Sequence, residues 1–409
     1  MKTLFYIGRP YPHITELQTL KSLGYKLGLF LDKTHTLRNP EIFDFCVALD
    51  FTSLESVRTS LLQIHSLPAI DGLLCLYENY IPHKTVIAEH LSLPAMSMQS
   101  ALACTDKYEM RTKFQKYNPE ITPKFTFVES KDQLLKFAAN AGYPIMLKPT
   151  NLVKSLLVSK CSSENELIEN YDKTIAQIEE VYARLHITDR EPRIIAEQFI
   201  EGSMCSVAAY VDHLGEPHFC DGIAELITAQ DIGFDDNFLY SRKLTNTIKP
   251  DLLSRILAVA RDGVHALSMR SSPAHIEIIY NEQEIKIVEI GARTGGYRPR
   301  LYRESYGLDL IQQEALIAVG DTPRLAGDFK KYSAIYELFP RTKGTFVRLD
   351  GDDSTTTYSY LHRTAKSGDI VGPAQDGFRS VAVFGVSSPD YQTFISRCKQ
   401  IEAIKVITS

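Results

Sequence analysis

Short apolar runs alternate with helical patterns of apolar positions over the first hundred residues of the chain. Each run has the length of a strand, and each helical pattern is long enough to return the chain to the start of the next strand. A β-α-β rhythm of this kind predicts a small parallel sheet covered by helices. The predicted strands are 3–7, 27–31 and 72–76, and the predicted helices are 14–23 and 54–64.

The rhythm changes at about residue 100, where strands and helices stop alternating regularly. A helix is expected to open at Asp106, and the apolar strand 142–149 carries Lys148 just before a proline that stops it. The last part of the chain mixes strands with one late helix, which predicts a small α+β cap. Further predicted elements are the helices 131–141 and 165–185, the strand 156–160 and a hairpin through 206–211 and 218–225.

Two β-rich runs, 274–280 and 284–290, each carry an acid among isoleucine and valine residues. A polar turn joins them, so they are expected to pair as antiparallel strands with Glu277 and Glu289 on the same side. An unpaired charge in a half-buried sheet is costly unless a cation neutralises it. Two convergent carboxylates suit magnesium, which takes few protein ligands together with phosphate oxygens. The alternative is that both acids lie on a solvated face of the hairpin.

Composition narrows the class of protein. With 409 residues the chain is too long for one ordinary core, so two or three domains are expected. The net charge of -5 argues against a nucleic-acid or anionic-membrane partner, since both usually require a basic face. The seven cysteines are scattered and form no CxxC pair, which is typical of a reduced, cytoplasmic protein without a zinc site. No apolar run has the length of a membrane span, and the first residues lack a signal-peptide pattern.

Two common nucleotide-binding motifs are absent from the sequence. The turn at 8–12 after the first strand lacks the GxGxxG spacing of a dinucleotide site, and no GxxxxGK[ST] occurs anywhere. A Rossmann cofactor site and a P-loop are therefore excluded as sources of nucleotide binding.

Several charged residues nevertheless follow one another in a characteristic order: Lys107, Lys148, a segment that starts at Glu197, the two acids of the hairpin, and Arg293. This ordered set resembles the ATP-grasp superfamily, specifically its carboxylate-amine, L-amino acid ligase-like branch, and the similarity covers nearly the whole chain. The resemblance implies an N-terminal parallel α/β domain (1–100), an ATP-grasp fold of two α+β subdomains that grip ATP (101–325, with a lid at about 123–195), and a C-terminal α+β cap (326–409).

The resemblance also implies a role for each matching residue. Lys107 and Lys148 would contact the nucleotide phosphates, as point charges on long stems can do. Glu277 and Glu289 would hold Mg²⁺ or Mn²⁺, and Arg293 would stabilise the phosphoryl group during transfer. The adenine and ribose would be held by the segment Glu197, Gln198, Phe199, Ile200 and Glu201.

The turn after Arg293 implies the place of the substrate. Gly295 and Gly296 would let the backbone pass close to it. Three arginines follow this turn, and one of them is expected to clamp a substrate carboxylate in a bidentate fork. Arg300 is our candidate for that clamp, with Arg298 and Arg303 as the alternatives.

The sequence departs from the family pattern at three places. The segment 150–155, which includes Lys154 and Ser155, contains no glycine, although relatives usually have a glycine-rich loop there. Met204 stands where relatives commonly have a glutamate for the ribose hydroxyls, and methionine cannot replace that acceptor. Gly291 stands where many members have an asparagine metal ligand, a variant also familiar in peptide-forming branches.

The implied function is an ATP-dependent ligase that joins a small carboxylate, such as an amino acid, to an amine through an acyl phosphate, with release of ADP and phosphate. Its partners would be small molecules, without nucleic acid or membrane, in a cytoplasmic protein for which a homodimer is one option. Two alternatives stay open. One is a purine-pathway-like ligase that uses bicarbonate or formate, and the other is a nucleotide-binding protein that has lost turnover.

Overall fold

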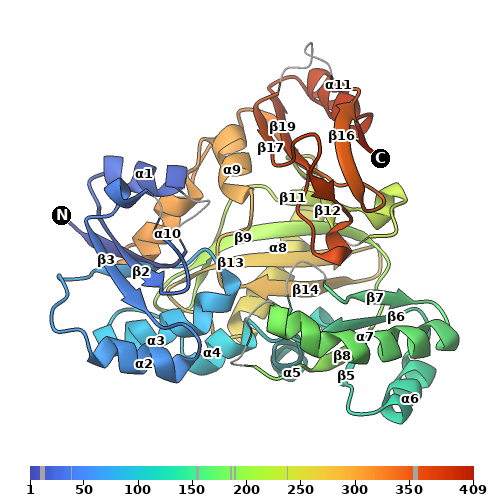
Figure 1. The fold of residues 1–409 in the computed structure, drawn as a ribbon, viewed down its shortest axis with the longest axis horizontal. Coiled ribbons are helices and arrows are strands. Elements are labelled where there is room, and N and C mark those ends of the chain that lie inside the picture. The colour runs from blue at the N-terminus through green and yellow to red at the C-terminus, as the bar shows by residue number, and fades with distance from the viewer. Residues whose placement is uncertain are drawn as a thin grey trace.

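The computed structural model describes most of the chain, and its elements form separate layers (Figure 1). The predicted turn at 8–12 and the predicted loop at 150–155 lie partly outside the described residues, and Lys154 and Ser155 lie wholly outside them. The described residues are 1–9, 14–37, 39–152, 156–184, 187, 190–236, 238–352 and 358–409.

The N-terminal sheet is parallel throughout, with strand order β3-β2-β1-β4, as the apolar rhythm predicts. Helices cover both of its faces. Leu17 and Leu20 of α1 share one core with Ile311 and Ala315 of α10, a helix from much later in the chain that lies beside α1 in Figure 1. The helices α2 and α3 pack on the other face. The bounds are β1 Thr3–Gly8, α1 Ile14–Ser22, β2 Lys26–Asp32, η1 Pro40–Ile42, β3 Phe45–Leu49, α2 Leu54–Leu62, β4 Gly72–Leu74, η2 Glu78–Tyr80, α3 Ile81–Leu91 and α10 Leu310–Ala318.

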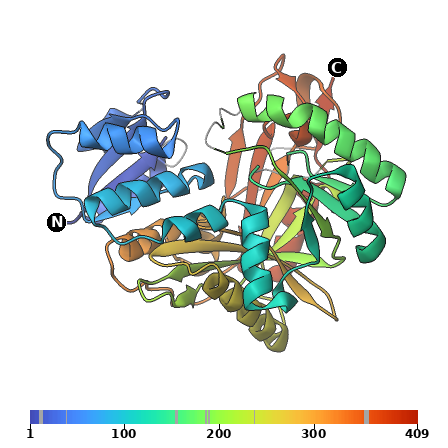
Figure 2. The same ribbon diagram turned by 90° about the horizontal axis from the view of Figure 1, so that it is seen from below.

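A second sheet, the lid sheet, is antiparallel and has the order β5-β8-β6-β7. Two helices, α6 and α7, cover it with an apolar core of their own, in which Leu134 and Ile178 are buried. Figure 2 shows the long helix α7 running across this part of the molecule. The bounds are α4 Met98–Ala103, α5 Lys107–Tyr117, η3 Pro119–Ile121, β5 Phe125–Phe127, α6 Lys131–Ala141, β6 Ile145–Pro149, β7 Ser159–Cys161, α7 Glu164–Arg184 and β8 Ile194–Gln198.

The third layer, the large sheet, is antiparallel and runs β14-β13-β9-β11-β12-β15-β19-β17, with β10 paired to β9. The C-terminal strands β15, β17 and β19 extend this sheet directly, while α11 and a small sheet of order β18-β16-β20 pack beside them (Figure 1). The bounds are β9 Ser203–Val211, β10 Pro217–Phe219, β11 Ala224–Thr228, η4 Gln230–Ile232, β12 Leu239–Leu244, α8 Pro250–Ala266, β13 Ser272–Tyr280, β14 Ile285–Gly291, α9 Arg298–Tyr306, β15 Tyr332–Leu338, β16 Gly344–Asp350, β17 Tyr360–Arg363, β18 Ile370–Val371, η5 Ala374–Asp376, β19 Ala382–Ser388, α11 Tyr391–Glu402 and β20 Lys405–Thr408.

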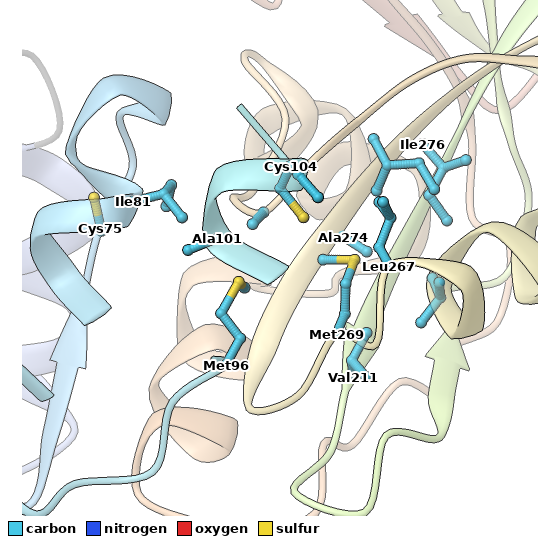
Figure 3. Packing of buried hydrophobic residues seen from close by; sticks show 14 of the residues in the cluster. Cys75, Ile81, Met96, Ala101, Cys104, Val211, Leu267, Met269, Ala274 and Ile276 are labelled. Carbon is cyan, nitrogen blue, oxygen red and sulfur yellow. The ribbon is translucent and has the colours of Figure 1, made fainter. Parts of the chain in front are cut away.

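One face of the large sheet is apolar and packs against helices. Figure 3 shows Met96, Ala101 and Cys104 on the side of the N-terminal helices, opposite Met269 and Ala274. The same core continues to α8 and to the inner face of the N-terminal sheet. Because this core holds the N-terminal domain and the large sheet together, the polar residues of β9, β13 and β14 are left on the opposite face, where α9 also packs.

Among the described residues, no helix combines the length and the apolar character that crossing a bilayer requires.

Candidate active site

The predicted acid-bearing hairpin forms as β13 and β14, and its register places Glu277 directly opposite Glu289. Residues opposite each other in an antiparallel pair have their side chains on the same face. Ser206 of β9 is the partner of Glu277 on its other side, so the three side chains form a row across the sheet. The register shifts after Glu277, where β13 and β14 pair irregularly. The prediction that the two acids face the same side is therefore confirmed.

A histidine fixes the carboxylate of Glu277. Nε2 of His275 lies 3.2 Å from Oε1 of Glu277, and because a carboxylate only accepts hydrogen bonds, Nε2 carries the proton. Burial lowers the pKa of His275 to about 4, so the imidazole is neutral near pH 7. Burial alone would raise the pKa of Glu277, but the hydrogen bond from His275 and the nearby guanidinium groups of Arg298 and Arg293 lower it to about 2. Glu277 is thus a half-buried, ionised carboxylate that can act as an oxygen ligand.

Lys107 joins the start of α5 to the second acid. Its Nζ lies 3.1 Å from Oε2 of Glu289 and donates to the carbonyl of Leu152 at 3.0 Å. Burial alone would lower the pKa of Lys107, but the carboxylates of Glu289 and Glu78 raise it. The side chain of Asp106 caps α5 by accepting from two backbone amides, which fixes the position of Lys107.

The described beginning of the glycine-free loop is held against this helix start. The backbone amide of Lys107 donates to the carbonyl of Thr150 at 2.6 Å, and the Thr150 hydroxyl donates to Asp106 at 2.8 Å. The hydroxyl of Tyr182 on α7 donates to the side chain of Asn151. Residues 150–152 are therefore attached both to α5 and to the lid helices.

Lys148 belongs to a buried group of three charges that joins the lid sheet to α5. Its Nζ lies 2.6 Å from Oε2 of Glu197, and Nε of Arg111 donates to Oε1 of the same carboxylate at 2.9 Å. Burial would raise the pKa of Glu197, but Arg111 and Lys148 lower it to about 2. Burial lowers the pKa of Lys148 although Glu197 opposes that change. Two cations share one carboxylate, so the group keeps an excess of positive charge beside β6.

Arg111 is a residue that the sequence analysis did not assign to the site. It is 1% exposed, and its Nη2 also donates to the carbonyl of Val288 in β14 at 2.7 Å. Its side chain therefore contacts both the lid sheet and the large sheet. A signal was present in the sequence, because Arg111 follows Lys107 by four residues and so lies on the same face of the helix.

The segment expected to hold adenine runs from the end of β8 toward β9. Ile200 is buried, Gln198 and Phe199 are half-buried, and Glu201 is exposed. Nζ of Lys160 lies 3.8 Å from the centre of the Phe199 ring, a cation-π distance. Met204 follows in β9, half-buried, with Leu226 and Ile279 as its strand partners.

Arg293 is paired with a carboxylate from the N-terminal domain. Its Nη2 lies 3.1 Å from Oε2 of Glu78, in the short helix η2. Burial and the charge of Glu289 raise the pKa of Glu78. Glu78 was not predicted from the sequence, although it follows the carboxyl end of the parallel strand β4, where sites of α/β sheets often form. Gly291 lies beside this carboxylate, since a Cβ there would be 3.4 Å from Oε2 of Glu78.

The glycine turn after Arg293 packs tightly on one side. A Cβ at Gly295 would lie 2.6 Å from Nδ1 of His275, so only glycine allows this approach, whereas a Cβ at Gly296 would meet nothing within 4 Å. Arg300 lies with its guanidinium 4.0 Å from the centre of the Tyr360 ring. Of the three arginines that follow the glycine turn, Arg298 is the buried one, with 2% of its surface exposed.

The carboxylates fit a hard divalent cation that shares its coordination with another ligand. Among the residues that the structure describes, no group of three or more histidine, cysteine or acidic side chains could enclose a metal ion. Two opposed carboxylates without a complete protein cage match the habit of Mg²⁺, which binds one or two carboxylates plus phosphates and waters.

The fold and the family comparison agree. A lid sheet and a large antiparallel sheet that meet at Lys107, Lys148 and two opposed acids define an ATP-grasp fold behind a parallel α/β domain. Residues 141–299 match the model of the ATP-grasp domain family, so the chain carries an ATP-grasp domain.

Individual proteins with known structures or names are similar over long stretches. The L-amino acid ligase from Bacillus licheniformis superposes with a TM-score of 0.79 at 20% identity, over 100% of this chain and 99% of that one. The biotin carboxylase domain of Hydrogenobacter thermophilus 2-oxoglutarate carboxylase, solved with MgADP and bicarbonate, gives a TM-score of 0.70 at 14% identity, over 100% of this chain and 91% of that one. At these identities the structures establish the fold.

A sequence relative is the alanine–anticapsin ligase of Bacillus subtilis, which is 23% identical over 266 residues, or 63% of this chain. The match spans 56% of that relative's length, little more than half. The similarity therefore supports the architecture of the site, and the activity of this chain is argued from its own residues.

Proposed function

We propose that this protein is an ATP-dependent carboxylate-amine ligase, which activates a small acid as an acyl phosphate and joins it to an amine. The observation that carries the proposal is the 3.1 Å contact between Lys107 and Glu289. This contact places Lys107, whose charge suits a phosphate, beside Glu289, and Glu289 lies opposite Glu277. A metal-bound triphosphate is positioned by cations that contact its phosphates and by carboxylates that hold its metal.

The nucleotide is assigned to the junction of the lid sheet and the large sheet. Lys148 and Lys107 contact the phosphates, and the excess positive charge of the Lys148, Arg111 and Glu197 group favours an anion there. The segment 197–201 takes the adenine and the ribose. The apolar side chains of the half-buried Phe199 and the buried Ile200 suit a planar base.

Glu277 and Glu289 hold magnesium or manganese in this proposal. When bound, the metal neutralises phosphate charge and orients the γ-phosphoryl group for transfer. His275 keeps Glu277 ionised and oriented through the hydrogen bond from Nε2, as a partner behind a metal ligand should.

A free carboxylate is a poor electrophile near pH 7, so it must be activated before an amine can attack it. A carboxylate oxygen of the acid attacks the γ-phosphorus, the bond from that phosphorus to the β-γ bridging oxygen breaks, and ADP leaves. The amine nitrogen then attacks the acyl carbon, its C–N bond forms as the C–O bond to phosphate breaks, and the nitrogen loses a proton. Arg293 faces the transferred group, and Glu78 fixes the orientation of its guanidinium.

The proposal also covers the domain boundaries, the partners and the assembly of the protein. The domain assignment is 1–100, 101–325 with a lid at about 123–195, and 326–409. The strands of the N-terminal sheet, β1 to β4, and those of the lid sheet, β5 to β8, lie near these limits and support it. The partners in this proposal are a small carboxylate and an amine. The protein itself is proposed to be a cytoplasmic homodimer. Size-exclusion chromatography with light scattering tests the dimer.

The test of the activity is release of ADP and phosphate from MgATP with pools of amino acids, small carboxylates, bicarbonate and formate, each with and without amines. Glu289→Ala is the blank, and Glu282→Ala, in the exposed turn of the same hairpin, is its matched control. Loss of a group that stabilises transferred charge typically lowers kcat ~100- to 1000-fold.

The outcomes separate the candidate functions. Release that needs both an acid and an amine, is lost in Glu289→Ala and persists in Glu282→Ala supports the ligase. If release depends on bicarbonate or formate, that compound, and not an amino acid, is the acid substrate. ATP binding without release above the blank in any pool would contradict the ligase in favour of a nucleotide-binding protein.

A further inference from the structure

Arg298 is a buried cation whose hydrogen bonds are incomplete. It is 2% exposed, its Nε donates to the Ser206 hydroxyl at 2.9 Å, and its Nη1 donates to the carbonyl of Gly296 at 3.1 Å. Within the described part of the chain, Nη2 is buried and has no hydrogen-bond partner. A buried guanidinium with an unpaired N–H group is costly, because the charge and the donor have both lost their contact with water. An anion beside Nη2 would supply the missing acceptor.

A second arginine of this region is Arg242, on β12. Arg242 is 8% exposed, and its Nη1 pairs with Oε2 of Glu337 at 2.7 Å. Its Nε is also buried without a partner among the described residues. Its guanidinium lies 5.2 Å from the centre of the ring of Tyr297, the residue next to Arg298. Two arginines thus share a region in which Glu337 pairs with only one of them.

The positive charge of Arg242 acts on Arg298. Burial and the charge of Arg242 lower the pKa of Arg298 to about 9, although Glu277 opposes the change. Arg298 is also the first residue of α9, where the helix dipole is positive and a cation is unfavourable. An arginine at this position works against the stability of the helix and strengthens the positive potential at its N-terminus.

The two arginines lie on the face of the large sheet that carries the acids. Ser206, which holds Arg298, is the strand partner of Glu277. In β11, Ala224 pairs with Ser206, and Leu226 on the same side of that strand pairs with Arg242. The anion that these arginines accept would therefore lie beside the acids and not on a separate surface of the molecule.

We propose that Arg298 and Arg242 form a subsite for a carboxylate that the reaction carries along but does not activate. This inference rests on the proposed ligase function, because a divalent cation at Glu277 would occupy the carboxylate whose charge now offsets Arg298. A guanidinium matches a carboxylate in size and in its paired donors. The two substrates together would thus carry two carboxylates. ATP activates one of them, and the two arginines bind the other. The second carboxylate belongs either to an acceptor amino acid or to a dicarboxylic acid donor.

The first test is a comparison of charged and neutral substrates in steady-state kinetics. Each amino acid acceptor is compared with its amide, and each dicarboxylic acid with its monoamide, using the full chain and MgATP. In Arg298→Gln and in Arg242→Gln, KM for the substrate with the second carboxylate is expected to rise roughly 10- to 100-fold, while the neutral analogue changes little. The substrate series that shows the effect identifies the source of the carboxylate. An equal loss for the charged and neutral members of both series would overturn the proposal.

Controls separate this role from a structural one. Arg298→Lys keeps the charge and is expected to restore part of the discrimination, whereas Arg255→Gln, exposed on α8, should leave it unchanged. If Arg298→Gln fails to fold, Arg242→Gln alone carries the comparison, because Arg242 lies on β12 and is not part of α9. Discrimination that is unchanged in a folded Arg242→Gln protein would then overturn the proposal.

The second test does not depend on turnover. Thermal unfolding is measured with MgADP and single amino acids or dicarboxylic acids, each against its amide. Carboxylate-dependent stabilisation of about 2 °C or more in the wild type, lost in Arg298→Gln, is expected. Such stabilisation without ADP release in any pool would retain the subsite and contradict the ligase. Ligase turnover without any charge-dependent stabilisation or KM effect would retain the ligase and contradict the subsite.

Discussion

Arg111 and Glu197 form a buried ion pair, with 2.9 Å between Nε and Oε1, although one lies on α5 and the other on β8 of the lid sheet. The same carboxylate accepts from Lys148 at 2.6 Å, and the same guanidinium donates to the carbonyl of Val288 in the large sheet. The orientation of the lid sheet relative to the acid-bearing hairpin is therefore tied to the charge of one glutamate.

Removal of that charge is expected to destabilise the protein strongly. Glu197→Ala leaves Arg111 and Lys148 buried without their carboxylate, and loss of one partner from a buried pair costs about 3–5 kcal/mol. The measurement is the free energy of unfolding in urea. Glu169→Ala, exposed on α7 of the same subdomain, is the matched control and should change stability by less than about 0.5 kcal/mol. Equal stabilities of the two variants would contradict the importance of the buried group.

Acid should weaken the protein through the same carboxylate. The pKa of Glu197 is lowered from 4.5 to about 2, so its contribution to stability is fully present above pH 4.5 and is lost as the pH falls toward 2. The shift corresponds to a loss of about 3 kcal/mol over that range. Urea unfolding at a series of pH values should show a steeper decline for the wild type than for Glu197→Gln. Parallel declines would show that Glu197 titrates normally.

Met204→Glu is expected to tighten nucleotide binding. The substitution restores a carboxylate acceptor at the position where relatives commonly bind the ribose hydroxyls, and one such hydrogen bond is worth about 1.5 kcal/mol, or roughly tenfold in Kd. Because Met204 is half-buried in β9, an acid of similar length at this position can reach solvent. Calorimetry with MgADP measures the effect, and Met204→Leu serves as the apolar control. Unchanged or weaker binding by Met204→Glu would place the ribose elsewhere.

Thiol reactivity tests the packing of the fold. Cys46 is exposed on β3, whereas the other six cysteines are buried. Burial raises the pKa of Cys75 and of Cys205 to about 12, which suppresses their reactive thiolate form. One thiol per chain should react rapidly with a disulfide reagent in the native protein, and seven after denaturation. Cys46→Ser should remove the rapid phase, and a second rapid thiol would indicate that one of these cores opens.

The local elements and the order of the charged residues follow from the amino-acid sequence alone. Short apolar runs that alternate with helical patterns predicted the parallel strands β1, β2 and β4, and a polar turn between two β-rich runs predicted the pairing of β13 with β14. These predictions succeeded because each depends on neighbours within a few dozen residues. The family resemblance, which rests on residue types in order, was likewise available before any coordinates.

Tertiary structure decided which distant residues meet. The C-terminal strands β15, β17 and β19 join the large sheet, and α10 returns to the N-terminal sheet, because each buries an apolar face that has no partner nearby in sequence. Glu78 pairs with Arg293 for a similar reason, since a buried charge takes its counter-charge from whatever element the core brings close. The choice between Arg298 and Arg300 as the buried arginine also depended on packing, because the two differ in environment and not in chemistry.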